Sequence, residues 1–236
     1  MTTLAVIYHS RSGNTHQLAA AAQRAGQEAG AEVRLRKVAD IPETMIADPE
    51  AHRRLADETA DVPEATLDDL AWADAIMVGT PVHFGLPAPQ IVNFIDHSGP
   101  IAIPGGLVNK AVTAFASGSM PHSGQQATIL ALHNAMCHWG SVIVPTGSSA
   151  EAMFRPGNGA PYGTATVSRH EPRNVADDNI EAIEFQTRRV LEVAEAVRPL
   201  HTTSTISYVD PEVLRGFGMD NLEWAWGWRR EPAGAQ

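Results

Sequence analysis

Short hydrophobic runs alternate along the chain with longer stretches in which apolar residues recur every three or four positions. The runs are rich in β-branched and other apolar residues and are bounded by polar residues, glycine or proline, which is typical of buried strands. These predicted strands cover residues 4–8, 32–38, 75–79, 111–115 and 141–145. The other stretches have the spacing of amphipathic helices. The predicted helices cover residues 14–30, 88–97, 125–138 and 177–197.

The order of these elements predicts an α/β fold. Strands that alternate with helices form a mostly parallel sheet with helices on both faces, and the loops at the carboxyl ends of the strands form the functional site. Charged and apolar residues alternate over residues 32–38, which predicts an edge strand with one face in water. The third strand is expected to end at Gly79, because Thr80 and Pro81 interrupt the run.

Residues 39–69 depart from this alternation. They contain Pro42, Pro49 and Pro63 and many acidic residues, with little periodicity beyond a short helix near residues 50–55. Such a composition predicts an exposed insertion. It is a solvated loop, a cover for the site or a contact with a neighbouring subunit.

The character of the chain changes again near its C-terminal end. A Ser/Thr stretch is followed there by Trp224, Trp226 and Trp228. Clustered indoles are usually buried, because large exposed apolar patches are uncommon on soluble proteins. We therefore predict one domain over residues 1–199 and a Trp-rich tail over residues 200–236 that docks on the domain or on a neighbouring subunit.

Composition and charge exclude several classes of protein. The 236 residues are 44% hydrophobic and 19% charged, as in ordinary globular proteins. The formal net charge of -10 disfavours nucleic acid, and no run approaches the roughly 18 apolar residues of a membrane span. The histidines show no His-x-x-x-His spacing for a metal. We predict no nucleic acid, membrane span or metal, and the single cysteine, Cys137, fits a reducing cytoplasm.

The strongest chemical signal is a polar loop between the first predicted strand and the first predicted helix. It consists of Ser10, Arg11, Ser12, Gly13, Asn14 and Thr15. A helix N-terminus offers unpaired N–H groups and a positive dipole end, and hydroxyl side chains add donors that can surround a phosphate. The alternative is a capped helix that binds nothing, because Ser, Asn and Thr are also capping residues. We favour phosphate, since the loop holds more hydroxyl groups than one cap requires.

Motifs of competing sites are missing from the sequence. It has no Gly-x-Gly-x-x-Gly after the first strand, no Gly-x-x-x-x-Gly-Lys-Ser/Thr and no Gly-x-Ser-x-Gly. Dinucleotide-binding Rossmann domains, P-loop NTPases and serine hydrolases are therefore disfavoured.

Two further loops follow predicted strands. Pro81, Val82, His83, Phe84 and Gly85 come after the third strand, and Ser117, Gly118, Ser119, Ser123 and Gly124 come after the fourth. An aromatic side chain and backbone polar groups in the first loop can flank a flat heteroaromatic ring. Exposed N–H groups in the second suit the carbonyl edge of a flavin. The alternatives are a proline-stiffened turn with Phe84 in the core and a flexible connector.

Together these loops resemble those of the WrbA-type NAD(P)H:quinone oxidoreductases of the flavodoxin-like superfamily. Other stretches that carry the resemblance are Phe94-Ile95-Asp96 with Ser98-Gly99, Val142-Ile143-Val144-Pro145 and Pro161-Tyr162-Gly163. The resemblance spans about residues 3–199. It implies a flavodoxin-like doubly wound five-stranded parallel sheet in the order 2-1-3-4-5. It also implies noncovalent FMN, NADH or NADPH as electron donor, a quinone or similar aromatic acceptor, and a homo-oligomer, commonly a tetramer.

The resemblance also assigns roles to the three loops. It implies that residues 10–15 hold the FMN phosphate, that Val82, His83 and Phe84 border the isoalloxazine, and that residues 117–124 hold its pyrimidine edge. His83 is a candidate to give a proton or hydrogen bond to the quinone, because histidine titrates near neutral pH. The alternative is a histidine that is simply packed or solvated.

Three positions depart from the pattern of the family. Ser12 stands where an aromatic residue often touches the nicotinamide, and Ala102 stands where a tryptophan often stacks on the substrate. Trp139 occupies the position of a histidine that faces the flavin. The resemblance therefore places Ala102 and Trp139 in the substrate site, with Trp139 beside the flavin.

Two other functions stay open at the level of sequence. A flavodoxin-type electron carrier would share the phosphate loop but accept hydride from a nicotinamide poorly. The other alternative is a flavodoxin-like scaffold without flavin that acts as an interaction module. The three departures and the Trp-rich tail favour it, and the phosphate loop argues against it. No residue distinguishes NADH from NADPH.

Overall fold

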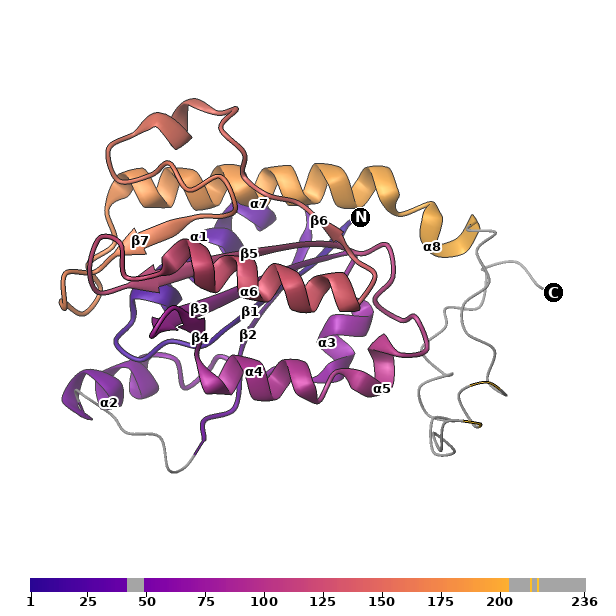
Figure 1. Ribbon diagram of the computed structural model, residues 1–236, viewed down its shortest axis with the longest axis horizontal. Coiled ribbons are helices and arrows are strands. Elements are labelled where there is room, and N and C mark those ends of the chain that lie inside the picture. The colour runs from indigo at the N-terminus through magenta and orange to yellow at the C-terminus, as the bar shows by residue number, and fades with distance from the viewer. Residues whose placement is uncertain (42–48, 204–212, 214–215, 217–236) are drawn as a thin grey trace.

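The computed structural model describes residues 1–41, 49–203, 213 and 216. At its centre lies a parallel sheet with strands in the order β2-β1-β3-β5-β6 (Figure 1). The strands are β1 (Thr3–Tyr8), β2 (Glu32–Lys37), β3 (Ala75–His83), β5 (Ala111–Gly118) and β6 (Val142–Ile143). Counted along the chain as five strands, this is the predicted order 2-1-3-4-5, which is confirmed.

The position of each strand in the sheet explains its sequence pattern. β1 lies between β2 and β3, and its side chains alternate between two hydrophobic clusters, so all of its core positions are apolar. Leu4, Val6 and Tyr8 belong to one cluster, and Ala5 and Ile7 belong to the other. β2 pairs with β1 as its only neighbouring strand in the sheet, apart from a single bridge between Lys37 and Glu64, and it buries only Leu35, as predicted for an edge strand.

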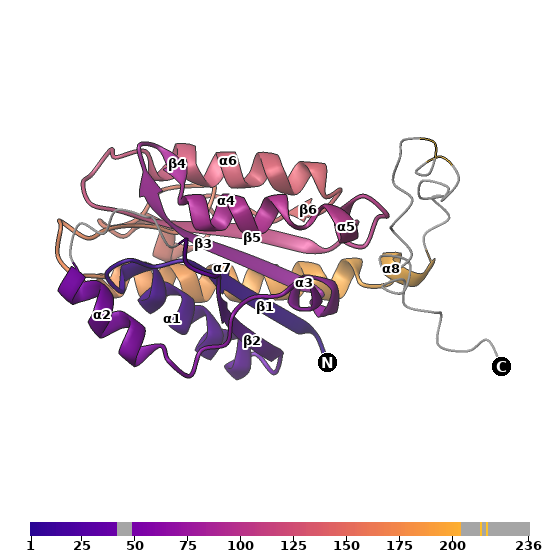
Figure 2. The ribbon, with the colours of Figure 1, turned by 90° about the horizontal axis from the view of Figure 1, so that it is seen from below.

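Helices cover both faces of the sheet (Figure 2). α1 (Asn14–Glu28) and α7 (Asp177–Val197) pack on one face, while α4 (Pro89–Asp96) and α6 (Gln125–His138) pack on the other. The predicted bounds of α6 and α7 are confirmed. Apolar residues of α1 and α7 share one cluster, which joins the start of the domain to its end.

The prediction that Thr80 and Pro81 end the third strand is wrong. β3 continues to His83 and turns into β4 (Leu86–Pro87), which pairs with it in antiparallel fashion. Pairing with β1 stops at Gly79, so the last part of β3 has a parallel neighbour only on the β5 side. A strand flanked on one side tolerates the missing N–H of proline.

The fifth strand is split, whereas the sequence predicts one strand over residues 141–145. β6 and β7 (Ala165–Val167) both pair with β5, and the chain between them contains the short 3₁₀ helix η1 (Glu151–Phe154). Two hydrogen bonds close this excursion: Thr146 Oγ1 to the carbonyl of Ala160, and Gly147 N–H to the carbonyl of Pro161. A strand as short as β7 has no recognisable periodicity in the sequence.

The described residues of the segment 39–69, which exclude 42–48, form more regular structure than the predicted exposed insertion. The predicted short helix is confirmed and lengthened as α2 (Pro49–Glu58), which buries Ala51 and Leu55. A second helix, α3 (Leu67–Trp72), follows it. The described part of the insertion therefore adds apolar side chains to the core.

The start of α3 is stabilised by a local cap and by contacts with β2. Thr66 and Asp69 form a capping box, in which the Asp69 carboxylate accepts hydrogen bonds from the backbone N–H and the hydroxyl of Thr66. The same carboxylate accepts from Arg34 and Arg36 of β2. Tertiary ion pairs thus stabilise a helix too short to show a hydrophobic repeat.

The predicted tail is described only at its beginning. α8 (Leu200–Thr203) carries His201, whose Nε2 lies 3.1 Å from the carbonyl oxygen of Asn109. Trp224, Trp226 and Trp228 and their predicted docking lie outside the described residues. Within the described ranges, no helix has the length and apolar character needed to cross a membrane.

Candidate functional site

The polar loop after β1 leaves the first turn of α1 open. Ser10 is buried, and its Oγ accepts a hydrogen bond from the N–H of Gly13 at 3.1 Å. Gly13 is the N-cap of α1 with φ 97°, and no side chain in the described ranges caps this helix. The alternative of a side-chain-capped helix is therefore wrong, and the first N–H groups of α1 are free for an anion. Arg11 and Ser12 are half-buried at the tip, and Thr15 is buried.

Asn14 directs its side chain into the protein. Its Nδ2 donates to Ser12 Oγ at 3.2 Å and to the carbonyl oxygen of Glu171 at 3.1 Å, while its Oδ1 accepts from the N–H of Asn174 at 2.6 Å. The loop between β7 and α7 is thereby tied to the phosphate loop. Sequence reasoning missed the contact of this loop with the phosphate loop, because Asn174 lies 160 residues after Asn14 and no motif links the two segments.

The hairpin formed by β3 and β4 presents an aromatic ring at the same edge of the sheet. Thr80 Oγ1 accepts from the N–H of Ala88 at 2.9 Å and donates to the carbonyl of Pro81 at 3.0 Å, which holds the hairpin in place. Phe84 lies at the tip with φ 53° and is fully exposed. The alternative of Phe84 in the core is therefore wrong, and Val82 is half-buried beside it.

The Ser/Gly segment after β5 touches this hairpin. A Cβ on Gly124 would lie 2.7 Å from the Cα of Gly85, so the two turns approach as closely as glycines allow. Gly124 is the N-cap of α6 with φ 95° and, within the described ranges, no side-chain cap. Because α1 and α6 follow the parallel strands β1 and β5, both helices begin at the carboxyl edge of the sheet.

Hydrogen bonds within this segment shape its turn. Ser123 Oγ and Gln125 Nε2 both donate to the carbonyl of Met120, at 2.9 and 2.8 Å. Ser117 and Gly118 are the last residues of β5, so they belong to the sheet and not to the loop predicted from sequence. The alternative of a flexible connector is therefore wrong for these two residues, while Ser119 begins the turn.

Two histidines lie near Arg11, and neither carries a charge at neutral pH. Burial, together with the nearby Arg11, lowers the pKa of His83. Burial lowers the pKa of His9 to about 4, with a smaller opposing effect from Asp40. The Nε2 atoms of both rings are buried and have no hydrogen-bond partner among the described residues. Each ring can therefore offer a neutral hydrogen-bonding atom to a ligand.

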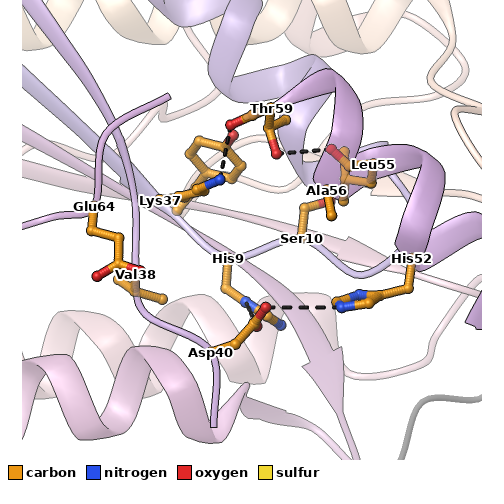
Figure 3. Close-up of a pocket in the computed structure, with 11 residues that line it drawn as sticks. His9, Ser10, Lys37, Val38, Asp40, His52, Leu55, Ala56, Thr59 and Glu64 are labelled. Atoms are coloured by element: carbon orange, nitrogen blue, oxygen red, sulfur yellow. Dashed lines mark hydrogen bonds and ion pairs between the residues drawn. The ribbon is translucent and has the colours of Figure 1, made fainter. Parts of the chain in front are cut away.

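A polar cavity of about 150 Å³ lies next to Ser10, beneath α2 (Figure 3). His9 and His52 flank the Asp40 carboxylate, with both nitrogen–oxygen distances at 3.8 Å. Lys37 Nζ donates to the carbonyl of Thr59 at 2.8 Å and joins β2 to the end of α2. No cluster suited to a metal ion occurs in the described ranges. Sequence reasoning missed His9, because nothing in the pattern marks it as more than the end of a strand.

Trp139 is buried in the core and does not lie with the three loops. It is 4% exposed, and its Nε1 donates to Ser98 Oγ at 3.0 Å. It follows the C-terminus of α6, and the 14 residues of this helix span roughly 20 Å from the Gly124 end. Within its own chain, Trp139 therefore lies at the opposite end of α6 from the three loops, and its position beside the flavin stays a prediction.

Ala102 lies in the same region as Trp139. It ends α5 (Gly99–Ala102), which follows Ser98, and it packs against the cluster that contains Trp139. The two predicted substrate positions thus share one cluster, against which Val82 of the hairpin also packs and to which residues 10–15 do not belong.

Comparisons of sequence point to one family. A profile of the family described as NADPH-dependent FMN reductase matches residues 2–155. The chain is 36% identical over 191 residues to the NAD(P)H dehydrogenase (quinone) of Deinococcus radiodurans, which covers 80% of this chain and 94% of that protein. It is 34% identical over 221 residues to NAD(P)H dehydrogenase (quinone) 3 of Rhizobium meliloti, which covers 91% of this chain and 100% of that protein.

Comparisons of structure agree on the fold. A flavodoxin, WrbA-like protein from Agrobacterium tumefaciens matches with a TM-score of 0.58 and 21% identity, over 84% of this chain and 99% of that chain. FerB, a flavoenzyme NAD(P)H:(acceptor) oxidoreductase from Paracoccus denitrificans, matches with a TM-score of 0.53 and 17% identity, over 84% of this chain and 99% of that chain. At these identities the likeness shows the fold alone, and the predicted flavodoxin-like fold is confirmed.

Proposed function

The chain belongs to the NADPH-dependent FMN reductase family, and we propose that it uses FMN to reduce quinones with two electrons from NADH or NADPH. The relatives named NAD(P)H dehydrogenase (quinone) support this activity, since they match nearly their whole length. The observation that carries the proposal is the convergence of the three loops, with the uncapped starts of α1 and α6 at the carboxyl edge of the sheet. Ligands of open α/β sheets bind at this edge.

The residues of the site suit FMN. Residues 10–15 offer N–H groups and hydroxyls to the phosphate, and the contact between Gly85 and Gly124 holds the hairpin against the segment after β5, so that both can border the ring. The buried Nε2 of His83 lacks a partner among the described atoms, as expected for a group that a ligand satisfies. When bound, FMN supplies a centre that takes up two electrons from a nicotinamide and releases them to an acceptor.

The side chains around this site bind and orient, and no dedicated acid or base is needed. Residues 117–124 and the first N–H groups of α6 would stabilise negative charge on the bound ring. Phe84 is exposed at the hairpin tip, where it offers a face on which an aromatic acceptor can stack. His83 is neutral at pH 7, so it gives a hydrogen bond to the quinone and not a proton from an imidazolium.

We also propose a cytoplasmic homo-oligomer, with the tetramer of the resembling family as the expected form. Val92 of α4 and Leu130 of α6, the helices that cover one face of the sheet, are 50% and 43% exposed, and Leu86 of β4 is 60% exposed. Large apolar side chains exposed on neighbouring elements mark an interaction surface. The single free cysteine, Cys137, fits a reducing compartment.

The test of the activity is an absorption spectrum of the protein after incubation with FMN and desalting. We expect retained yellow flavin that bleaches on anaerobic addition of NADH or NADPH and recovers its absorption with benzoquinone. Retained flavin that neither nicotinamide bleaches would instead identify a one-electron carrier. Loss of all flavin on desalting, with no turnover when FMN is supplied in excess, would identify a flavin-free interaction module.

A further inference from the structure

The loop between β7 and α7 lies over the phosphate loop in a strained backbone conformation. Arg169, His170 and Arg173 have φ of 54°, 64° and 57°, in the left-handed region that non-glycine residues rarely adopt. Backbone strain of this kind persists where the surrounding structure holds it, and it is concentrated at binding sites.

Asn14 fixes this loop in place. It binds the carbonyl of Glu171 and the N–H of Asn174, so the residues on both sides of Arg173 are attached to the first residue of α1. The Nδ2 of Asn174 donates in turn to the carbonyl of Ser168 at 3.0 Å, which closes the loop on itself. The position of Arg173 relative to the start of α1 is thus fixed by hydrogen bonds.

The side chain of Arg173 passes directly over Gly13. A Cβ on Gly13 would lie 2.8 Å from Arg173 Cγ, 3.3 Å from Nε and 3.7 Å from Cδ. The pKa of His16 is lowered first by burial and second by Arg173. The positive charge of Arg173 therefore acts on the first turn of α1. A guanidinium therefore stands beside N–H groups that already suit an anion.

The guanidinium is paired with an acid that a ligand can replace. Arg173 Nη2 contacts a carboxylate oxygen of Glu58 at the end of α2, and the two side chains are 44% and 43% exposed. An ion pair with this exposure contributes little to stability, so exchanging one anion for another is not opposed by a large loss. Phosphate, with two negative charges and a geometry that accepts two guanidinium N–H groups, is the stronger partner.

We propose that Arg173 is a ligand of the FMN phosphate and that it exchanges Glu58 for the phosphate when the cofactor binds. The proposal rests on the proposed function, because it takes FMN as the ligand of the loop at residues 10–15. Glu58 then acts as a competitor that keeps α2 attached while the cofactor is absent. Binding of FMN releases α2 from Arg173 and leaves it attached through the contacts of Lys37 and His52.

Dissociation constants of FMN and riboflavin test the proposal, because the two flavins differ only in the phosphate. They are measured by flavin fluorescence with the apoprotein. Arg173→Gln is expected to weaken FMN about tenfold or more, the effect of one charge-assisted hydrogen bond or a pair of them, while riboflavin affinity stays unchanged. Arg173→Lys should recover part of the loss. Arg169→Gln, which removes the same charge from the same loop, is the matched control and should leave both constants unchanged.

Glu58→Gln tests the exchange separately. It removes the competing carboxylate and is expected to tighten FMN about threefold, with no change for riboflavin. Equal FMN affinity in wild type, Arg173→Gln and Glu58→Gln would overturn the proposal and leave the proposed function intact. Equal losses for FMN and riboflavin in Arg173→Gln would overturn it too, since the change would then act through the fold. A wild-type protein that binds neither flavin would overturn both.

Discussion

Gly13 combines two constraints at a single residue. Its φ of 97° is one that L-residues avoid, and the space where a Cβ would stand is taken by Arg173. Gly13→Ala is therefore expected to destabilise the protein by about 1–2 kcal/mol and to weaken FMN, because the first turn of α1 and the guanidinium are both displaced. Urea unfolding of the apoprotein and an FMN titration would measure the two effects. Unchanged stability would show that the loop relaxes without cost.

His9 makes the stability of the fold depend on pH. Burial lowers the pKa of His9 to about 4 from 6.5, so the folded state keeps the ring neutral while the unfolded chain binds a proton below pH 6.5. Its contribution is complete above pH 6.5 and is lost as the pH falls toward 4. The groups that face the ring are Asp40, His52, His83 and Arg11.

We therefore expect the free energy of unfolding of His9→Asn to decrease by about 2 kcal/mol less than that of wild type when the pH is lowered from 7 to 5. Urea unfolding at both pH values provides the measurement. His138→Asn, at an exposed position, is the matched control and should follow wild type. A His9 variant that loses as much stability as wild type would show that this ring does not drive the pH dependence.

At the scale of elements, a change at the tip of the β3–β4 hairpin is expected to alter catalysis without altering stability. Because the ring of Phe84 is fully exposed, Phe84→Ala removes no buried contact and should leave the unfolding midpoint within measurement error. The same change removes the aromatic face that we propose for stacking of the acceptor. We expect the KM for benzoquinone to rise about three- to tenfold with kcat and FMN affinity little altered. A variant with unchanged KM would place the acceptor away from the hairpin.

Elements with many buried apolar positions are those that the sequence predicts well. α6 and α7 each bury residues along their full length, and their predicted bounds agree with the structure. α3 and β7 escape the pattern, because six and three residues contain too few positions for a period to show. Their existence depends on tertiary contacts such as the Asp69 carboxylate with Arg34 and Arg36.

At the scale of the molecule, the sequence predicts loops that lie at strand ends and misses contacts between distant segments. Residues 10–15, the hairpin and residues 117–124 meet because carboxyl ends of parallel strands share one edge. His9 and the Arg173 loop are missed, because burial and a hydrogen bond across 160 residues leave no local signal.

The proposed assembly is tested on the α4 and α6 face. Val92→Asp combined with Leu130→Asp places charge on two exposed apolar positions, and we expect the native mass to fall toward that of the monomer. Light scattering after gel filtration measures the mass. Leu200→Asp, an exposed apolar change on α8, serves as the control. A double variant with the wild-type mass would place the interface elsewhere.

The hydrogen bonds of Asn14 to Glu171 and Asn174 have a consequence for the time at which the protein matures. The phosphate loop leaves the ribosome before the loop that completes it, because Asn174 follows Asn14 by 160 residues. During synthesis at about 5–20 residues per second, a nascent chain that stops before residue 171 has no such cover over Gly13. Cofactor loading is therefore expected to begin only when most of the domain has been translated.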